Sequence, residues 1–312
     1  YTASPGNVLA TPATRRLARD LGVDLNSVPA TGPHGRVTKE DLQNFGGATS
    51  AGPAMPVQTR GSVPAPRPSL HAPGARETLI PFRGIRKKIS EAMVKSRFTI
   101  PDFTYVDECD VTELVNFRKE AKVMAEKEGV KLTFMPFIIK AVIRALKEFP
   151  YMNAELDEAG GNIVLKNYYN IGIAIDTEQG LVVPSVKDAD RKSIMEIARE
   201  IQDLSQKAKT GKLSLDDLKG STFTITNSGN IGGMLATPVI NFPEVGILGV
   251  HKTSRRPIVK MVDGKETIAI ADVMWLSVAV DHRVVDGANG ARFMNIVLEY
   301  LGNPKKLLLD MA

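Results

Sequence analysis

From residue 77 onward, apolar side chains recur with two different periods, which predicts helices and strands interleaved along the chain. Spacings of three and four residues predict helices over Gly84–Arg97, Asp110–Gly129, Thr133–Phe149, Ser193–Thr210, Ser214–Asp217 and the stretch from Gly287 to Leu301. Three of these segments begin with a capping-box pattern, formed by Asp110 with Glu113, Ser193 with Glu196 and Ser214 with Asp217.

Alternating or unbroken apolar runs predict strands between these helices. The runs fall at Phe103–Asp110, Asn162–Lys166, Asn170–Asp176, Leu181–Val186, Thr222–Thr226, Val245–Val250, Ile258–Val262, Thr267–Ala271 and Trp275–Val280. The turn Asp176–Gly180 is expected to close a hairpin. Such a mixture predicts an α+β domain, residues 77–312, built on a largely mixed sheet.

Residues 8–45 carry two short helix signals around a glycine-bearing loop. Thr11 can cap the first helix with Pro12 at its first position, and Gly22 ends it. Thr38 and Asp41 form a capping-box pattern that opens the second helix. A stretch this short has few residues from which to build a core of its own.

The segment 46–76 is rich in Pro, Ala, Gly and Ser and has no periodic apolar face. Such a composition cannot bury enough surface to offset its ordering entropy, so we expect a flexible linker. Residues 1–7 have a similar composition, and the chain begins at Tyr1 rather than Met. We therefore expect 1–7 to be a linker remnant that further sequence precedes.

Charge and composition then narrow the classes of function. The formal net charge is +5, but Arg60, Arg67 and Arg76 lie in the predicted linker, which contains no acid. The remaining charges are nearly balanced, which argues against a nucleic-acid-binding protein. No apolar run approaches the roughly 20 residues that a membrane helix needs, so we expect no membrane association.

Cofactor signatures are weak. Cys109, the single cysteine, lies among acids that raise a thiol's pKa, so it is a poor nucleophile candidate. The four histidines are scattered without metal-ligand spacing, so we expect no metal. His251 is expected to be structural or exposed. Residues 229–233 (GNIGG) lack the lysine of a phosphate-binding loop and are interpreted as a turn.

The strongest chemical candidate is His282, in the stretch 281–287 (DHRVVDG). A strand is expected to end there and a helix to follow, and catalytic side chains concentrate in such loops. Imidazole can act as a general base near neutral pH because its unperturbed pKa is about 6.5. Taken alone, a histidine at a strand end is more often structural.

Several stretches in register resemble one family. Residues 282–287 are similar to the HxxxDG signature of dihydrolipoyl acyltransferases, the pyruvate- or branched-chain-type core components of 2-oxo acid dehydrogenase complexes, which chloramphenicol acetyltransferases share. The stretches 221–229 (STFTITNSG), 241–249 (NFPEVGILG) and 170–174 (NIGIA) resemble the same acyltransferases. The resemblance runs from about Ile80 to the C-terminus. It implies a chloramphenicol-acetyltransferase-like fold that assembles as trimers.

The resemblance also implies roles for individual residues. His282 is expected to deprotonate the thiol of coenzyme A or of dihydrolipoamide. Thr226 is expected to donate its hydroxyl to the tetrahedral oxyanion, although a threonine there also suits a strand. Asp286 is expected to hold the His282 loop by an ion pair or hydrogen bonds, with its partner left open. His282 and Thr226 are expected to come from neighbouring subunits.

Residues 8–45 resemble the peripheral subunit-binding domain of these acyltransferases. That resemblance implies docking of the decarboxylating 2-oxo acid dehydrogenase or of dihydrolipoyl dehydrogenase, through Arg15 and Arg36. Without it, the arginines of this segment are better interpreted as a solvated face. The trimers are expected to build a cubic or icosahedral core, with contacts from the apolar segment Pro304–Met311.

Acyl coenzyme A is therefore the expected substrate, together with a lipoyl group carried on a lipoyl domain outside these 312 residues. Acetyl is the expected acyl group, and branched-chain transfer is the alternative that 100–108 and 176–180 favour. A free-standing small-molecule acetyltransferase and a non-catalytic core or docking protein are the alternatives of other classes. The expected location is the cytoplasm of a bacterium or the mitochondrial matrix of a eukaryote.

Overall fold

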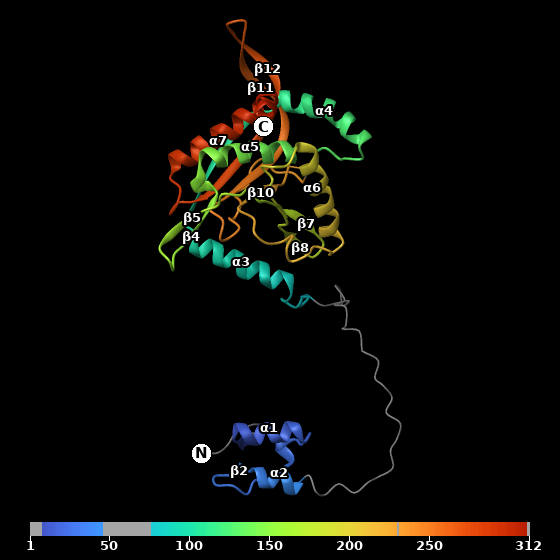
Figure 1. The fold of residues 1–312 in the computed structure, drawn as a ribbon, viewed down its shortest axis with the longest axis vertical. Helices are drawn as coiled ribbons and strands as arrows, with labels where there is room; N and C mark the ends of the chain where they lie inside the picture. The colour runs from blue at the N-terminus through green and yellow to red at the C-terminus, as the bar shows by residue number, and fades with distance from the viewer. Residues whose placement is uncertain (1–7, 46–75, 230, 311–312) are drawn as a thin grey trace. The chain divides into compact units, whose positions relative to one another are not determined.

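The computed structural model describes residues 8–45, 76–229 and 231–310 (Figure 1). The chain divides into two compact units, Tyr1–Thr78 and Leu79–Ala312. The linker remnant predicted at 1–7, and the predicted linker at 46–76 apart from Arg76, lie outside the described residues. In the part that is described, no helix is both long and apolar enough to cross a membrane.

The first unit pairs two helices over a small core. Its elements are β1 (Leu9–Ala10), α1 (Pro12–Asp20), a 3-10 turn η1 (Leu25–Ser27), β2 (Arg36–Val37) and α2 (Lys39–Phe45). Thr11 caps α1 as expected, because its side chain accepts a hydrogen bond from the Thr14 N–H at 3.2 Å. The buried core consists of Ala18, Val28, Val37 and Leu42.

A buried carboxylate closes the loop of this unit. Asp41 accepts hydrogen bonds from the Thr31 hydroxyl, from the Thr38 N–H at 2.8 Å and from the Thr31 N–H at 3.2 Å. These bonds, the one from the Thr31 hydroxyl above all, lower the pKa of Asp41 to about 2. The Asp41 N–H in turn donates to the Thr38 hydroxyl oxygen at 3.3 Å, so the predicted capping box is confirmed.

The second unit is organised on a six-stranded sheet with the order β3-β12-β11-β10-β6-β9. Strand β10 runs parallel to β11 and to β6, and the other neighbours are antiparallel. The strands are β3 (Asp102–Asp110), β6 (Ile171–Ile173), β9 (Ser185–Val186), β10 (Phe223–Asn227), β11 (Gly246–Val262) and β12 (Lys265–Asp281). The predicted mixed sheet of an α+β domain is confirmed.

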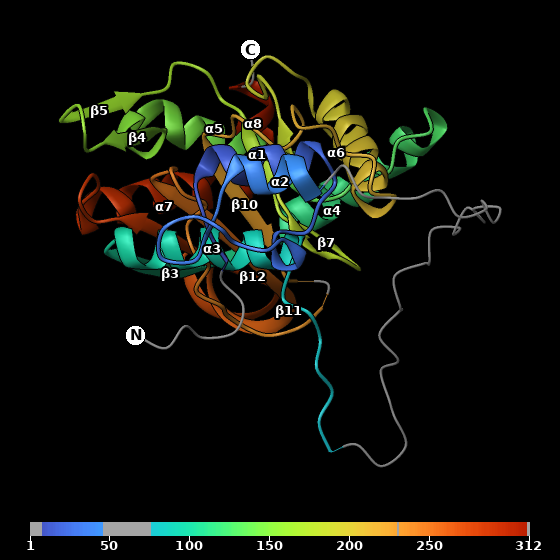
Figure 2. The same cartoon turned by 90° about the horizontal axis from the view of Figure 1, so that it is seen from below.

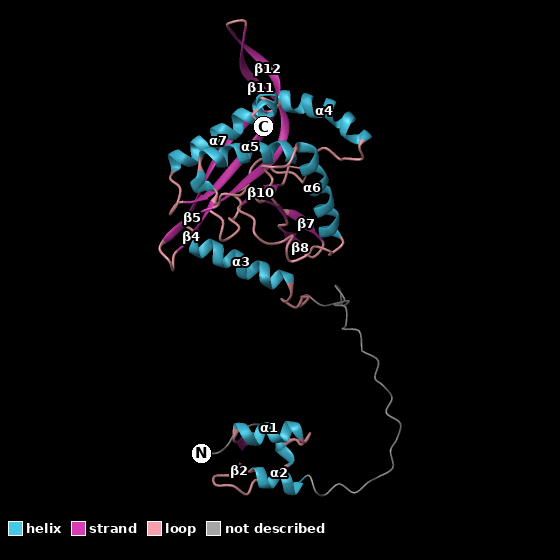
Figure 3. Ribbon diagram, in the orientation of Figure 1, coloured by secondary structure: helices cyan, strands magenta, loops and turns pink. Residues whose placement is uncertain are grey.

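Four predicted strands are in fact two long ones. The runs expected at Val245–Val250 and Ile258–Val262 belong to β11, and those at Thr267–Ala271 and Trp275–Val280 belong to β12. Polar residues interrupt the apolar pattern because this part of the hairpin is exposed, and the hairpin projects from the sheet (Figures 1 and 3). A shift of register lies between Val250 and Thr253.

Helices cover the sheet. They are α3 (Ile85–Thr99), α4 (Thr112–Lys127), α5 (Met135–Glu148), α6 (Ile194–Lys209), α7 (Gly287–Gly302) and α8 (Pro304–Leu309). Most of α5 is buried, and it runs beside α7 (Figures 1 and 2). The capping box of Ser193 with Glu196 is confirmed at the start of α6.

Two helix predictions are wrong in detail. Residues 215–219 form a turn rather than a helix, although Ser214 and Asp217 exchange the hydrogen bonds of a capping box. Helix α4 begins at Thr112 after Val111, whose side chain makes no cap bond, and Asp110 instead accepts from the Thr112 N–H at 3.1 Å. Reciprocal capping bonds therefore occur without a helix that continues them.

Short hairpins complete the unit. Strands β7 (Ile175–Thr177) and β8 (Gly180–Val182) pair across the predicted Asp176–Gly180 turn, which is confirmed. Strand β5 (Asn162–Leu165) pairs with β4 (Ala154–Asp157), which the apolar pattern did not reveal. A 3-10 turn η2 (Pro150–Met152) precedes β4.

Candidate active site

His282 lies in the turn between β12 and α7, directly after the strand ends. Its backbone N–H donates to the Pro101 carbonyl oxygen at 3.0 Å. Its imidazole packs against the Phe103 ring, with centroids 4.8 Å apart and planes at 55°. Phe103 belongs to β3, the strand next to β12. The ends of β3 and β12 therefore hold the imidazole in an exposed position. A general base must be exposed in this way to reach its substrate.

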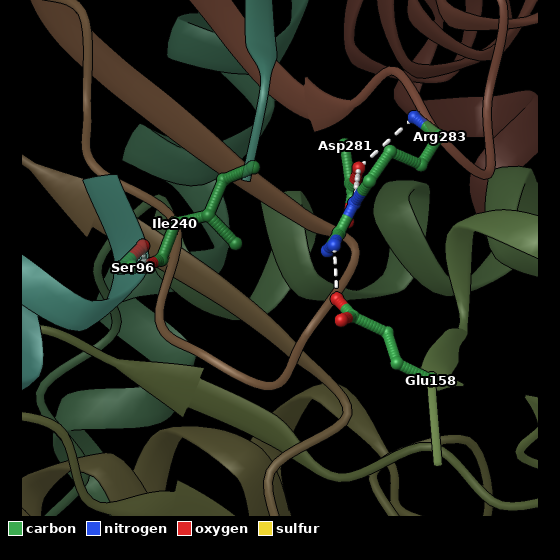
Figure 4. Close-up of polar contacts among 5 residues, drawn as sticks. All are labelled: Ser96, Glu158, Ile240, Asp281 and Arg283. Carbon is green, nitrogen blue, oxygen red and sulfur yellow. Dashed lines mark hydrogen bonds and ion pairs between the residues drawn. The ribbon is translucent and has the colours of Figure 1, made fainter. Parts of the chain in front are cut away.

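Asp281 and Arg283, the residues on either side of His282, form an ion pair with each other (Figure 4). Arg283 donates from Nη2 to Asp281 Oδ2 at 2.6 Å and from Nε to Oδ1 at 2.9 Å. The Asp281 side chain is 3% exposed, and its hydrogen bonds raise the pKa of the Arg283 guanidinium. Arg283 also forms an ion pair with Glu158. This clamp fixes the backbone that carries His282.

Asp286 caps helix α7. Its carboxylate accepts from the Asn289 N–H at 2.7 Å and from the Asn289 side-chain amide at 3.2 Å. Asn289 is therefore the partner that the sequence left open. Asp286 fixes where the helix begins, whereas Asp281 and Arg283 hold the turn itself.

Thr226 lies half-buried near the end of β10, opposite Gly249 of β11. It lines a cavity of about 280 Å³, hereafter the Thr226 cavity. The lining consists of Met93, Ala174, Leu181, Val183, Thr224, Thr226, Ser228, Ala236, Pro238, Val239, Asn241, Ile247 and His251. Thr226 thus presents its side chain to a small, mostly apolar space.

A buried histidine forms part of this wall. His251 is 3% exposed, with Nδ1 at 3.3 Å from the Ser228 hydroxyl and Nε2 at 2.8 Å from the Ser277 hydroxyl. Burial lowers the pKa of His251. Of the two alternatives left open for His251, the structural one is confirmed and exposure is excluded. Its polar partners were invisible in the sequence because Ser277 is 26 residues away on the neighbouring strand.

A second buried group lies behind the same wall. Glu244 accepts hydrogen bonds from Thr224 at 2.6 Å and from the Asn241 amide at 2.8 Å, and it also bonds to Ser221. Burial raises the pKa of Glu244 to about 7, although these bonds act in the opposite direction. In the sequence, the only indication of this network was an acidic residue, Glu244, within the mostly apolar stretch 240–250.

Strand register separates Thr226 from His282 within one chain. Thr226 pairs with Gly249, and Gly249 pairs with Ser277, which precedes His282 by five residues. Five residues at about 3.3 Å each and two strand spacings of about 4.8 Å put the two Cα atoms roughly 19 Å apart. A single chain therefore does not bring the predicted base and the predicted oxyanion donor together.

Other candidate groups take no part in this site. Cys109 is buried, and burial above all, with Asp110 and Asp107, raises its pKa to about 12. In residues 8–45, 76–229 and 231–310 no three His, Cys, Asp or Glu gather as possible metal ligands. Ile231 and Gly232 both donate to the Ser228 carbonyl oxygen, which is the expected turn.

The two predicted docking arginines lie beside the β1–β2 ladder of the first unit. Arg15 donates from Nη2 to the Val8 carbonyl oxygen at 2.7 Å. Arg36 pairs through its backbone with Leu9, the residue after Val8. Both arginines are exposed.

Two protein families match this chain, one for each of its two compact units. Residues 74–309 match the family of 2-oxoacid dehydrogenases acyltransferase catalytic domains, and residues 8–43 match the e3 binding domain. The dihydrolipoyllysine-residue acetyltransferase component of the pyruvate dehydrogenase complex from Bacillus subtilis (strain 168) is 45% identical over 309 residues, which cover 97% of this chain and 68% of that protein.

Two solved structures share the fold. Azotobacter vinelandii dihydrolipoamide acetyltransferase is 37% identical, with a TM-score of 0.71 over 79% of this chain and 100% of that one. The cubic core of a pyruvate dehydrogenase multienzyme complex is 36% identical, with a TM-score of 0.71 over the same shares. The chain therefore belongs to the 2-oxoacid dehydrogenase acyltransferases, and an E3-binding domain precedes its catalytic domain.

Proposed function

We propose that this acyltransferase moves an acyl group, acetyl foremost, between a dihydrolipoyl group and coenzyme A, with His282 as base and Thr226 as oxyanion donor. The study of the Azotobacter enzyme concerns a serine, a histidine and an asparagine four residues after that histidine in its catalytic mechanism. This chain has Asp286 four residues after His282, and a threonine supplies the hydroxyl. The aspartate keeps a side-chain acceptor for capping α7.

The proposed chemistry uses one proton carrier and one donor. The His282 imidazole takes the proton from the thiol of coenzyme A, and the thiolate attacks the thioester carbonyl of the acylated dihydrolipoyl group. The Thr226 hydroxyl donates to the oxyanion as negative charge develops. When the intermediate collapses, the dihydrolipoyl thiolate leaves and regains the proton from His282.

The separation of Thr226 from His282 carries the proposal that two subunits share each active site. Roughly 19 Å between their Cα atoms is too far for both to reach one carbonyl group in a single chain. In the segment between Ser228 and Ala236, which both line the Thr226 cavity, Ile231 is 82% and Met234 is 64% exposed. Exposed apolar side chains at this position support burial against another subunit, whose His282 would complete the site.

Mixing two inactive variants tests the shared site. His282→Ala and Thr226→Ala chains are unfolded together in equal amounts and reassembled. In randomly mixed trimers, about one quarter of the interfaces would pair an intact His282 with an intact Thr226, so activity should return to about a quarter of wild type. Wild type and each parent taken through the same cycle are the controls. Mixed trimers as inactive as their parents would show that both residues act within one chain.

We also propose that the chain self-assembles into trimers and a cubic or icosahedral core. The apolar residues Val259, Met261, Ile268 and Ile270 of the projecting hairpin are at least 66% exposed, and Leu309 is 81% exposed. Leu307 differs from the expectation for Pro304–Met311, because it is buried within its own chain. Mass measurement in solution tests assembly, and a stable monomer at micromolar concentration would contradict it.

Residues 8–45 are proposed to dock dihydrolipoyl dehydrogenase or the decarboxylating dehydrogenase, with 46–76 as linker and 77–312 as catalytic domain. The match to an E3-binding domain and the exposed Arg15 and Arg36 support this role. A free-standing small-molecule acetyltransferase would have no use for a docking domain, so residues 8–45 disfavour that alternative. The presence of His282 disfavours a purely structural core.

A further inference from the structure

The wall of the Thr226 cavity carries a serine and a histidine that can exchange a proton. Ser228 directly follows β10, and it lines the cavity with Thr224 and Thr226 because alternate residues of a strand share one face. His251 lines the same cavity from β11, with Nδ1 at 3.3 Å from the Ser228 hydroxyl. The transfer chemistry proposed above uses neither of these two side chains.

Hydrogen-bond direction makes Nδ1 of His251 an acceptor. The Ser277 hydroxyl donates to the Ala236 carbonyl oxygen at 2.9 Å, so at 2.8 Å it accepts from Nε2–H of His251. Burial lowers the pKa of His251 and so favours the uncharged ring. In that ring Nδ1 has no proton and accepts from the Ser228 hydroxyl. The Nε2 bond therefore holds the ring in the wall, and Nδ1 is a base beside Ser228.

The backbone around this pair keeps the two side chains together. The Ser228 N–H donates to the Val250 carbonyl oxygen at 3.0 Å, which ties the serine to the strand that carries His251. A Cβ at Gly249 would lie 2.5 Å from Ser277 Oγ and 3.0 Å from His251 Nε2. Gly249 therefore leaves the room that the hydrogen bond between His251 and Ser277 requires.

A hydroxyl beside a base that a third group orients is the arrangement of nucleophilic catalysis. The 3.3 Å between Ser228 and His251 is slightly longer than the usual range of about 2.6–3.2 Å, and such contacts are often longer when no substrate is bound. In the described part of the chain, the Thr226 hydroxyl makes no hydrogen bond. It lines the same cavity, so it can donate to an oxyanion formed beside Ser228.

We propose that Ser228 and His251 form a second catalytic pair, which hydrolyses acyl thioesters within one chain. His251 Nδ1 takes the proton of the Ser228 hydroxyl while Oγ attacks the thioester carbonyl carbon. The C–S bond then breaks, and the leaving thiolate takes that proton, which leaves the acyl group on Ser228 as an ester. Thr226 donates to the oxyanion.

Water completes the cycle. His251 takes a proton from a water molecule whose oxygen attacks the Ser228 ester, and the ester C–O bond breaks. The proton returns to Ser228 Oγ, and a carboxylic acid leaves. One thioester and one water thus give one acid and one thiol. The inference goes beyond the proposed transfer and shares with it only the thioester and Thr226.

Release of coenzyme A from acetyl-CoA, by the assembled enzyme without dihydrolipoamide, provides the first test. A thiol reagent measures it, and Cys109 adds little background because it is buried. Ser228→Ala and His251→Gln should each lower enzyme-dependent hydrolysis by about a hundredfold or more. Ser214→Ala, at an exposed position far along the sequence from both, is the control and should hydrolyse like wild type.

The His282→Ala variant separates hydrolysis from transfer. It should keep hydrolysis and lose transfer, because the Ser228 pair does not include His282. Hydrolysis lost in His282→Ala but kept in Ser228→Ala would overturn the inference and leave the transfer function intact, as would no hydrolysis above the buffer rate. Hydrolysis that depends on Ser228 in an enzyme without transfer activity would support the inference and overturn the proposed function.

A fluorophosphonate, which labels activated serines, gives a second measurement that does not depend on turnover. Peptide mass spectrometry of the wild-type enzyme should find the label on Ser228, and His251→Gln should acquire it about a hundredfold more slowly. Solution mass checks that each variant assembles like wild type. Equal labelling of Ser228 in wild type and His251→Gln, or no labelling of Ser228 in the assembled wild type, would overturn the inference.

Discussion

At the level of single residues, the candidate site consists of two groups that need different surroundings. His282 is exposed and held through its backbone and neighbours, so the ring is accessible from solvent. Thr226 is half-buried in a mostly apolar wall, where a hydroxyl donor is worth more than in water. A base must be accessible to the substrate, whereas an oxyanion donor acts best at a site from which water is excluded.

Replacing His282 with alanine should lower kcat by about 10²–10⁴-fold, because a general base contributes roughly that factor. Free imidazole should restore part of the lost rate, since it supplies the missing base without the side chain. Steady-state kinetics measure both effects, and solution mass checks that assembly is unchanged. A variant that keeps more than a tenth of the wild-type rate would rule out the assigned base.

Thr226→Val removes one hydroxyl at nearly constant volume. It should cost about 2.7–4 kcal/mol of transition-state stabilisation, or about 10²–10³ in kcat, by analogy with the loss of one oxyanion donor elsewhere. Thr226→Ser keeps the hydroxyl and is the matched control, with a mild effect expected. Equal rates for the valine and serine variants would show that the hydroxyl donates nothing to the oxyanion.

At the level of elements, the turn before α7 depends on bonds between residues that the chain places close together. Asp281 and Arg283 clamp each other across His282, and Asp286 caps the helix that follows. The signature residues around the histidine are therefore divided between holding the turn and starting α7. Asp281, Arg283 and Asp286 therefore fix the backbone on which His282 lies.

Asp286→Ala removes the cap of α7. We expect a loss of about 1 kcal/mol in the free energy of unfolding. That corresponds to a decrease of about 2–4 °C in the Tm of a domain this size, measurable by calorimetry. Asp286→Asn keeps an acceptor for the Asn289 N–H and should retain most of the stability and rate. If the asparagine variant were as inactive as His282→Ala, the carboxylate would have a role beyond capping.

The loop of the first unit should respond to acid through Asp41. Its pKa of about 2 in the folded chain lies below the roughly 3.9 of an unfolded aspartate. Because the folded pKa is the lower one, this contribution to stability is present above about pH 4 and is lost as the pH falls toward about 2.

Circular dichroism of residues 1–45 against pH measures that loss. Asp41→Asn should be less stable at neutral pH and should show a flatter pH dependence between about 4 and 2. Glu40→Gln, on the adjacent exposed position, is the control and should titrate like wild type. An unchanged pH profile in Asp41→Asn would contradict the assignment.

At the level of the whole molecule, the chain combines a small unit that matches an E3-binding domain with a catalytic unit in which strand register keeps Thr226 and His282 apart. In the small unit, hydrogen bonds to Asp41 hold the loop in addition to the small apolar core. Arg15 and Arg36 are exposed on this unit. The catalytic unit leaves apolar side chains exposed on its projecting hairpin and in the segment between Ser228 and Ala236. Both units therefore present surfaces that are suited to other chains.

Docking through charge should be sensitive to salt. Arg15→Ala combined with Arg36→Ala should weaken binding to dihydrolipoyl dehydrogenase and flatten its dependence on ionic strength, because close charge pairs steer and hold such complexes. Titration calorimetry at several salt concentrations measures both. Arg16→Ala combined with Arg19→Ala removes the same charge from exposed positions and should have the smaller effect. The reverse order would refute the assignment of docking to Arg15 and Arg36.

Local sequence patterns were sufficient to predict much of the secondary structure of this protein and one of its candidate site residues. The caps at Thr11 and Ser193 were predictable because each involves residues within three positions of each other. The strand periods, the α+β class and the HxxxDG candidate His282 came from equally local patterns, together with the family resemblance. Contacts of short sequence separation follow from local chemistry, so a single sequence reveals them.

Other features depend on which strands become neighbours. The continuous β11 and β12, the buried His251 between Ser228 and Ser277, and the Glu244 network all join positions that only the sheet brings together. The distance between Thr226 and His282 follows from the register of three strands, and a register is set by packing and pairing along their whole length. No local pattern contains that information, because shifting one strand would leave every local signal unchanged and move the site.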